Sequence, residues 1–164
     1  MMLYLKWGAV VLMLLVALFI GREYSAYMER RLAQMRGFSS LFSHAEEMIS
    51  KYLSPADAIV SDFTDPELEK CGFLPALREG KDLLGAFEAC SGQLALTSGM
   101  KREIGEFLSG FGRGYKDGEL KRISAFRRRL EQEMASCAES AQKDVKAVRA
   151  LLFGGAMAAG ILII

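Results

Sequence analysis

Few residues of this sequence have the types and spacing that catalysis or metal binding requires. His44, the single histidine, has no nearby arrangement of Cys, Asp or Glu at the spacing of a metal site. Glu46 and Glu47 are adjacent, but neighbouring residues of a helix point about 100° apart, which favours a solvated face over an acid pair. We therefore predict a protein that is not an enzyme and that holds neither a metal ion nor a cofactor.

A glycine-rich run, Gly-Phe-Gly-Arg-Gly, occupies residues 110–114. A phosphate-binding loop follows a strand and ends in Lys-Ser/Thr, whereas this run follows an expected helix and lacks that pair. Nucleotide binding is therefore disfavoured.

The three cysteines, Cys71, Cys90 and Cys137, are an odd number with no close pairing along the chain. Such a set fits a reducing compartment better than a disulfide framework. The cysteines thus favour a cytosolic location for the part of the chain that carries them.

The 164 residues leave room for one domain, and a hydrophobic content of 51% is high for a soluble protein that also has 25% charged residues. The apolar excess lies at the two ends. Basic residues outnumber acidic ones by four to two over Arg22 to Arg36 and by eight to five over Glu119 to Arg149, whereas Gly37 to Asp117 contains eight basic and thirteen acidic residues. We therefore expect basic arms beside the apolar ends and an acidic lobe between them.

The last third of the chain, from Asp117 to Ile164, is predicted to form one helix that starts in water and ends in a membrane. Asp117 is a candidate N-cap, no proline interrupts the segment, and the charges stop after Arg149. At about 1.5 Å per residue the helix would be on the order of 70 Å long, too long for a compact domain unless part of it lies in lipid. Its apolar stripe is Leu120, Ile123, Phe126, Leu130, Met134, Cys137, Ala141, Val145, Val148 and Leu152.

Residues 1–21 are predicted to form a transmembrane helix. The apolar run from Met1 to Ile20 is broken only by Lys6, whose long side chain can reach a lipid headgroup. A cleaved signal peptide is the alternative, but the run ends without a small-x-small cleavage motif, which favours a retained anchor.

Residues 148–164 are predicted to form a second transmembrane or membrane-inserted helix. This segment is short, since crossing a hydrocarbon core of ~30 Å usually takes about 20 residues, so it would cross with local thinning or stop short of the far side. Small residues on both spans would allow close helix packing in lipid, within the protein or against a partner membrane protein. These residues are Ala17, Gly21, Gly155, Ala156, Ala159 and Gly160.

Basic residues flank both expected spans on the same side. Four arginines follow the first span, and Lys143, Lys146 and Arg149 precede the second, while only Lys6 and the amino terminus lie on the other side. Because the cytosolic side of a span carries the excess of Lys and Arg, the middle of the chain is expected to be cytosolic.

Between the spans, apolar residues recur at helical spacing, and no segment keeps a strand period for more than a few residues. Gly37 is expected to mark a break after a cytosolic stalk. Further helices are expected from Phe38 to Leu53, from a Ser54-Pro55 start through Val60, from an Asp65-Pro66 start through Cys71, from Phe73 to Arg78, from Lys81 to Cys90, and from a Ser98 cap to the glycines at 110, 112 and 114.

The predicted fold is therefore all-α, a membrane-anchored helical bundle with hydrophobic helices at both ends and a long C-terminal helix. We divide it into a transmembrane helix (1–21), a cytosolic helical stalk (22–36), a cytosolic helical lobe (37–117), a long helix packing on lobe and stalk (118–147) and the C-terminal membrane helix (148–164).

A basic band lies on the long helix and consists of Arg127, Arg128 and Arg129, with Lys121 and Arg122 one or two turns before them. Nucleic-acid binding would favour interleaved aromatic residues and an overall basic lobe, and the sequence has neither. The band is more typical of a solvated face or of a surface for an acidic partner.

The order of these segments resembles the stage III sporulation protein AB family of endospore-forming bacteria. The first span closes in Gly21-Arg22-Glu23, and an arginine-rich stalk that includes Arg31 follows. Glu47 to Pro55 is similar to the family's glutamate-rich helix leading to a proline, and the segment from Gly112 through Gly114 to Asp117 is similar to its glycine and aspartate loop. The sequence departs from the family where a glutamine usually follows that loop, since Glu119, Leu120 and Lys121 stand there.

The resemblance implies a non-enzymatic membrane platform in the mother-cell membrane, with the bulk of the chain cytosolic. It implies a role in the channel complex between mother cell and forespore, and contacts with other membrane subunits and the assembly ATPase, while self-association stays open. The cytosolic lobe would be similar to the helical domain of F-type platform proteins of type II secretion systems. The alternative is a small membrane-bound regulator or sensor whose acidic lobe binds a soluble partner.

Overall fold

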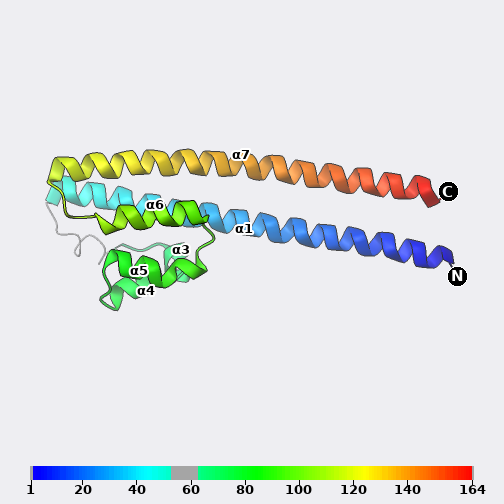
Figure 1. The fold of residues 1–164 in the computed structure, drawn as a ribbon, viewed down its shortest axis with the longest axis horizontal. Coiled ribbons are helices and arrows are strands. Elements are labelled where there is room, and N and C mark those ends of the chain that lie inside the picture. Colours follow the sequence, from blue (N-terminus) through cyan, green and yellow to red (C-terminus); the bar gives the residue numbers. More distant parts are fainter. Residues whose placement is uncertain (1, 53–62, 164) are drawn as a thin grey trace. The chain divides into compact units, whose positions relative to one another are not determined.

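The computed structural model describes residues 2–52 and 63–163, and these contain only helices and the segments that join them (Figure 1). The all-α prediction is therefore confirmed. The chain divides into two compact units. The central unit is Arg30–Ala135, and the terminal unit combines Met1–Glu29 with Ser136–Ile164.

The first helix, α1 (Met2–Tyr52), passes through Gly37 without interruption, so the predicted break at that residue is wrong. Gly37 has a packing role instead. A Cβ atom at this position would lie 2.8 Å from Asp65 Oδ1 and 3.0 Å from Leu68 Cγ. The glycine thus allows the segment that begins α3 to approach the α1 backbone closely.

The short helices α3 (Pro66–Lys70) and α4 (Phe73–Arg78) begin with local capping signals. Asp65 is the N-cap of α3, and its Oδ1 accepts hydrogen bonds from the Glu67 and Leu68 backbone N–H groups at 3.0 Å each. Proline at the first helical position costs no hydrogen bond, because its N–H would be unpaired anyway. The predicted Asp65-Pro66 start and the bounds of α4 are confirmed.

Two predicted helix starts need correction. Helix α5 (Leu83–Cys90) begins after the N-cap Asp82, whose Oδ1 accepts from Gly85 N–H at 3.0 Å, and not at Lys81. A 3-10 turn, η1 (Ser91–Gln93), follows it. Helix α6 (Ser98–Ser109) is capped by the Thr97 hydroxyl, which accepts from Met100 N–H at 3.3 Å, so Ser98 is the first helical residue instead of the cap. The helix expected from Ser54 lies outside the described residues.

The last helix, α7 (Lys116–Ile163), has 48 residues and no proline. It begins one residue before Asp117, so the prediction of Asp117 as its N-cap is wrong. The carboxylate of Asp117 lies in the first turn, where the positive end of the helix dipole favours a negative charge.

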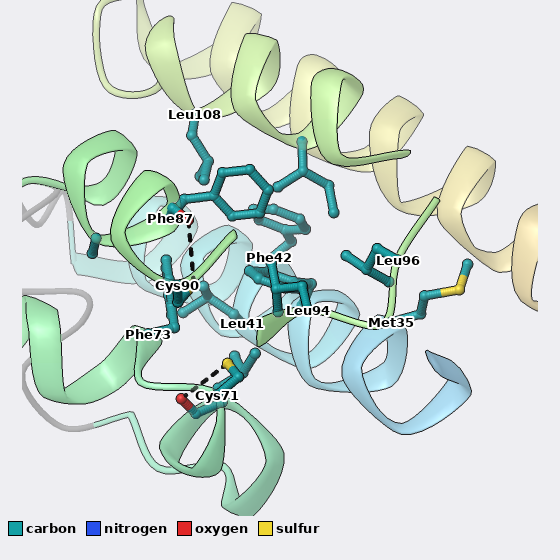
Figure 2. Packing of buried hydrophobic residues seen from close by; sticks show 14 of the residues in the cluster. Met35, Leu41, Phe42, Cys71, Phe73, Phe87, Cys90, Leu94, Leu96 and Leu108 are labelled. Atoms are coloured by element: carbon teal, nitrogen blue, oxygen red, sulfur yellow. Dashed lines mark hydrogen bonds between the residues drawn. The ribbon is translucent and has the colours of Figure 1, made fainter. Parts of the chain in front are cut away.

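The core of the central unit combines apolar faces of α1, α4, α5, α6 and α7 (Figure 2). Phe42 of α1 lies at the centre of an aromatic cluster. Its ring centroid is 4.9 Å from that of Phe107 and 5.4 Å from that of Phe126, in edge-to-face geometry. The largest fully buried side chains are Phe38, Phe42, Phe73, Met35, Leu68, Leu74, Ile104, Ile123, Leu130 and Cys90.

In the terminal unit, the first part of α1 and the last part of α7 pair with each other. Tyr24 Oη donates a hydrogen bond to Asp144 Oδ2 at 2.6 Å, and Cys137 Sγ lies 3.9 Å from Met28 Sδ. Because residue numbers rise along one helix as they fall along the other, the two segments are antiparallel. We expected this pairing between the stalk and the long helix.

The predicted membrane segments also lie in the terminal unit. Among the residues that the structure describes, no helix combines the length and the apolar character needed to cross a membrane. Gly155 is exposed, and a Cβ atom there would meet nothing within 4 Å, so the structure shows no close packing at this glycine. Gly21 is half-buried. The surroundings of Ala17, Ala156, Ala159 and Gly160 lie outside what the structure describes.

Candidate functional site

The turn between α6 and α7 is built around a buried carboxylate. Glu119, in the first turns of α7, is only 3% exposed. Its Oε1 accepts a hydrogen bond from Gly112 N–H at 3.1 Å, and its Oε2 lies 3.4 Å from Arg122 Nη1. A buried charge is stable when it is paired in this way, so Glu119 ties the turn to the helix that follows it.

Arg122 extends this network to the end of α6. Its Nη1 donates to the Gly110 carbonyl at 2.8 Å, and its Nη2 donates to the Phe107 carbonyl at 3.1 Å. The guanidinium carbon also lies 5.2 Å from the centroid of the Phe107 ring, within cation–π range. One arginine therefore satisfies two carbonyls at a helix end, where carbonyl groups lack partners within the helix.

The three glycines of the predicted loop are explained by this network. Gly112 has φ 76°, a left-handed conformation that favours glycine. A Cβ atom at Gly114 would lie 2.9 Å from Glu119 Oε2, and one at Gly110 would lie 2.9 Å from Arg122 Nη2. The turn thus needs small residues at these points to fold around two side chains of α7.

Of the three adjacent arginines in the predicted basic band, two make ion pairs within the central unit. Arg127 Nη1 lies 2.6 Å from Glu46 Oε2 on α1, and Arg127 Nη2 lies 3.6 Å from Glu131. Arg129 Nη2 lies 2.8 Å from Glu103 on α6. The pairs with Glu46 and Glu103 connect α7 to α1 and α6, whereas the pair with Glu131 lies within α7.

Arg128 differs from its neighbours. Its side chain is exposed and has no hydrogen-bond or ion-pair partner among the described residues. Within the band, Arg128 and the exposed Lys121 are left for the solvated face or the acidic partner that we expected.

The adjacent acids Glu46 and Glu47 point to different partners, as expected for neighbours on a helix. Glu46 pairs with α7, whereas Glu47 Oε1 lies 2.5 Å from Lys51 Nζ on the exposed side of α1. The hydrogen bond from Lys51, together with its positive charge, lowers the pKa of Glu47 below its ordinary value. This geometry agrees with the interpretation against an acid pair.

The remaining predicted residues are not gathered at one place. Gly21 and Glu23 lie in the terminal unit, and Glu23 is exposed. Arg31 lies in the central unit, where its Nε is buried without a hydrogen-bond partner among the described residues. Asp117 is exposed beside the α6–α7 turn. Of the residues inferred from the resemblance, Gly112 and Gly114 lie next to Glu119 and belong to its network.

His44 is half-buried on α1. Its ring centroid lies 5.7 Å from that of Phe63, and its Nε2 is buried without a hydrogen-bond partner among the described residues. In the part of the chain that the structure describes, no three His, Cys, Asp or Glu side chains come together in a group that would hold a metal ion.

The three cysteines are free and buried. Cys71 and Cys90 lie in the core of the central unit, where their Sγ atoms donate to the carbonyls of Leu68 at 3.4 Å and Phe87 at 3.3 Å (Figure 2). The hydrogen bond shared with Cys71, together with burial, raises the pKa of the Cys90 thiol above its ordinary value. The same hydrogen bond lowers the pKa of the Cys71 thiol to about 7. Because burial keeps both thiols away from reagents in solution, their alkylation reports opening of the central unit.

The contacts of three side chains in the central unit were not predicted from the sequence. Gln34, 2% exposed, accepts a hydrogen bond from Ala95 N–H at 2.7 Å and so ties α1 to the segment before α6. Glu119 and Arg122 form the network at the α6–α7 turn. Their spacing of three residues on a helix was a local signal for pairing, but nothing in the spacing indicated burial.

Replacing Glu119 with alanine is expected to destabilise the central unit by about 1–3 kcal/mol, because the Gly112 N–H and the Arg122 guanidinium lose a buried partner. Glu119→Gln keeps an acceptor for the Gly112 N–H and should lose less stability than Glu119→Ala. The measurement is urea unfolding of the full chain, followed by alkylation of Cys71 and Cys90. Equal losses for the two variants would contradict a hydrogen-bonding role for Oε1.

Replacing Arg127 with alanine is expected to lower the free energy of unfolding by about 1–2 kcal/mol. This loss lies between those for exposed and for fully buried ion pairs, because both side chains of the Arg127–Glu46 pair are about 30% exposed. Arg128→Ala is the matched control and should stay within about 0.5 kcal/mol of the unchanged chain. A double-mutant cycle with Glu46→Ala measures the coupling. A coupling energy of zero would show that the pair does not stabilise the contact of α1 with α7.

The fold and the site together define an all-helical protein in which ion pairs tie α7 to α1 and α6, and buried polar contacts hold the α6–α7 turn. The family model for stage III sporulation protein AB matches residues 6–164. The chain therefore belongs to the stage III sporulation protein AB family. Comparison of the chain with curated proteins and with solved structures gave no match.

Proposed function

We propose that this protein is a non-enzymatic platform component of the channel complex between mother cell and forespore, required for endospore formation. In this role it contacts other membrane subunits and the assembly ATPase. The family match over residues 6–164 carries the proposal, because it extends over both apolar ends and the central unit. The ion pairs and buried polar contacts of the central unit support a structural role.

We also propose that the chain is anchored in the mother-cell membrane, with the central unit in the cytosol. The support comes from the apolar ends of the sequence and from α1, where large apolar side chains remain exposed. Side chains such as Phe19, 67% exposed, gain free energy when they move from water into lipid. The exposed group is Val11, Leu12, Leu15, Val16, Leu18, Phe19 and Ile20.

Purification of the tagged full chain from sporulating cells tests the platform role. A platform should bring down several other membrane proteins and an ATPase. Recovery of a single soluble protein would instead favour the regulator or sensor, and recovery of no protein would overturn both.

Labelling of an introduced cysteine tests the topology. Cys71 and Cys90 are unsuitable reporters, because burial alone shields them. Lys70→Cys places a thiol on the exposed surface of the central unit. This thiol should react with an impermeant maleimide only after the cells are permeabilised. Labelling in intact cells would reverse the proposed orientation.

A further inference from the structure

The turn between α6 and α7 presents two side chains that take no part in its own fold. Glycines at 112 and 114 leave Arg113 and Tyr115 as the only side chains of residues 112–115. Tyr115 is 96% exposed, and Arg113 is exposed as well. Neither side chain has a hydrogen bond, an ion pair or a ring contact with the described part of the chain. A tyrosine so exposed contributes no hydrophobic burial to this fold.

The backbone beneath these two side chains is held from several directions. Glu119 binds the Gly112 N–H, and Arg122 binds the Gly110 carbonyl. Lys116 Nζ donates to the Ser50 carbonyl near the end of α1 at 2.7 Å. A turn fixed in this way loses little conformational entropy when a partner binds, so the exposed side chains are arranged in advance.

The charge around the turn is positive. Residues 112–122 contain four basic and two acidic residues, and Arg122 neutralises one of the acids, Glu119. Arg113 and Lys121 are exposed and have no side-chain partner among the described residues. Tyrosine and arginine are also among the residue types that contribute most to binding energy at protein interfaces.

We propose that Arg113 and Tyr115 form the centre of a docking surface for an acidic segment of a partner protein. Arg113 pairs with a carboxylate of that segment, and the Tyr115 ring packs against its apolar side chains. The inference depends on the proposed function in one respect: a component of an assembly must have protein partners.

Photo-crosslinking of the full chain in sporulating cells tests the proposal. The crosslinker p-benzoylphenylalanine takes the place of Tyr115 and keeps an aromatic group there. We expect one dominant product, in which the crosslinked peptide comes from another protein and carries an excess of Asp and Glu. Arg113→Glu should lower the yield at least fivefold, and changing the facing acidic residues of the partner to lysine should restore it.

Arg128→Glu is the matched control, since it reverses the charge of another exposed arginine without a partner among the described residues. Its yield should equal that of the unchanged chain. The proposal would be overturned if Arg128→Glu lowered the yield as much as Arg113→Glu does. It would also be overturned if the crosslinked product contained lipid, a second copy of this chain or a neutral or basic segment, or if no product formed.

The two proposals fail in distinguishable ways. A chain that still co-purifies with membrane subunits, yet gives no acidic crosslink at position 115, would overturn the docking surface and leave the platform role standing. A crosslink to one soluble protein through an acidic segment, with no membrane subunits recovered, would support the docking surface and overturn the platform.

Discussion

Phe42→Ala is expected to lower the free energy of unfolding of the central unit by about 3–5 kcal/mol. Phe42 is 1% exposed, and its ring contacts those of Phe107 and Phe126 in the cluster that joins α1, α6 and α7. Alanine would leave a cavity between three helices whose backbones cannot all move inward. Since domains of this size are stable by about 5–15 kcal/mol in total, the loss is a large fraction of the whole.

Urea unfolding of the full chain, followed by alkylation of Cys71 and Cys90, measures this loss. Phe111→Ala is the matched control, because Phe111 is half-buried and, among the described residues, its ring contacts only that of Phe107, at 5.9 Å. Phe111→Ala should lower the free energy of unfolding by less than half as much as Phe42→Ala does. Equal losses would show that the aromatic cluster is not the centre of the core.

Gly37→Ala and Gly118→Ala are expected to change stability in opposite directions. Alanine favours a helix over glycine by up to about 1 kcal/mol, and at Gly118 the added Cβ atom would meet open space, so that variant should gain stability. At Gly37 the Cβ atom would collide with Asp65 Oδ1 and Leu68, and a net loss of about 1–3 kcal/mol is expected.

The same thiol-alkylation measurement compares the two glycine variants. The collision at Gly37 is with an N-cap carboxylate, which cannot move away without losing its bonds to Glu67 and Leu68 N–H. A gain in stability for Gly37→Ala would show that α3 moves away at no cost. In that case the glycine would not be required for close packing.

Local sequence signals predicted much of the helical order. The spacing of Phe38, Leu41 and Phe42 predicted the buried face of α1, and all three side chains are 2% exposed or less. Asp65-Pro66 predicted the start of α3, because an N-cap carboxylate and a proline act within one turn of helix. Such signals depend only on neighbouring residues, which one sequence contains in full.

The wrong break at Gly37 and the missed partner of Arg127 involve contacts between distant residues. Gly37 looked like a helix break, because its reason for being glycine is Asp65, 28 positions further along the chain. Arg127 looked solvated, because its partner Glu46 is 81 residues away. Neither periodicity nor capping rules indicate which helix will lie opposite a given residue, so pairs of this kind need the tertiary structure.

The contribution of α7 to the central core has a consequence for synthesis of the protein. Ile123 and Leu130 are 0% and 1% exposed, and they belong to the same cluster as Met35 and Phe38 of α1. As the ribosome makes the chain from its amino terminus, the α1 side of the core is complete long before α7 exists. During that interval its aromatic face lacks part of its cover, and it is then that the nascent chain is most exposed to aggregation or to binding by chaperones.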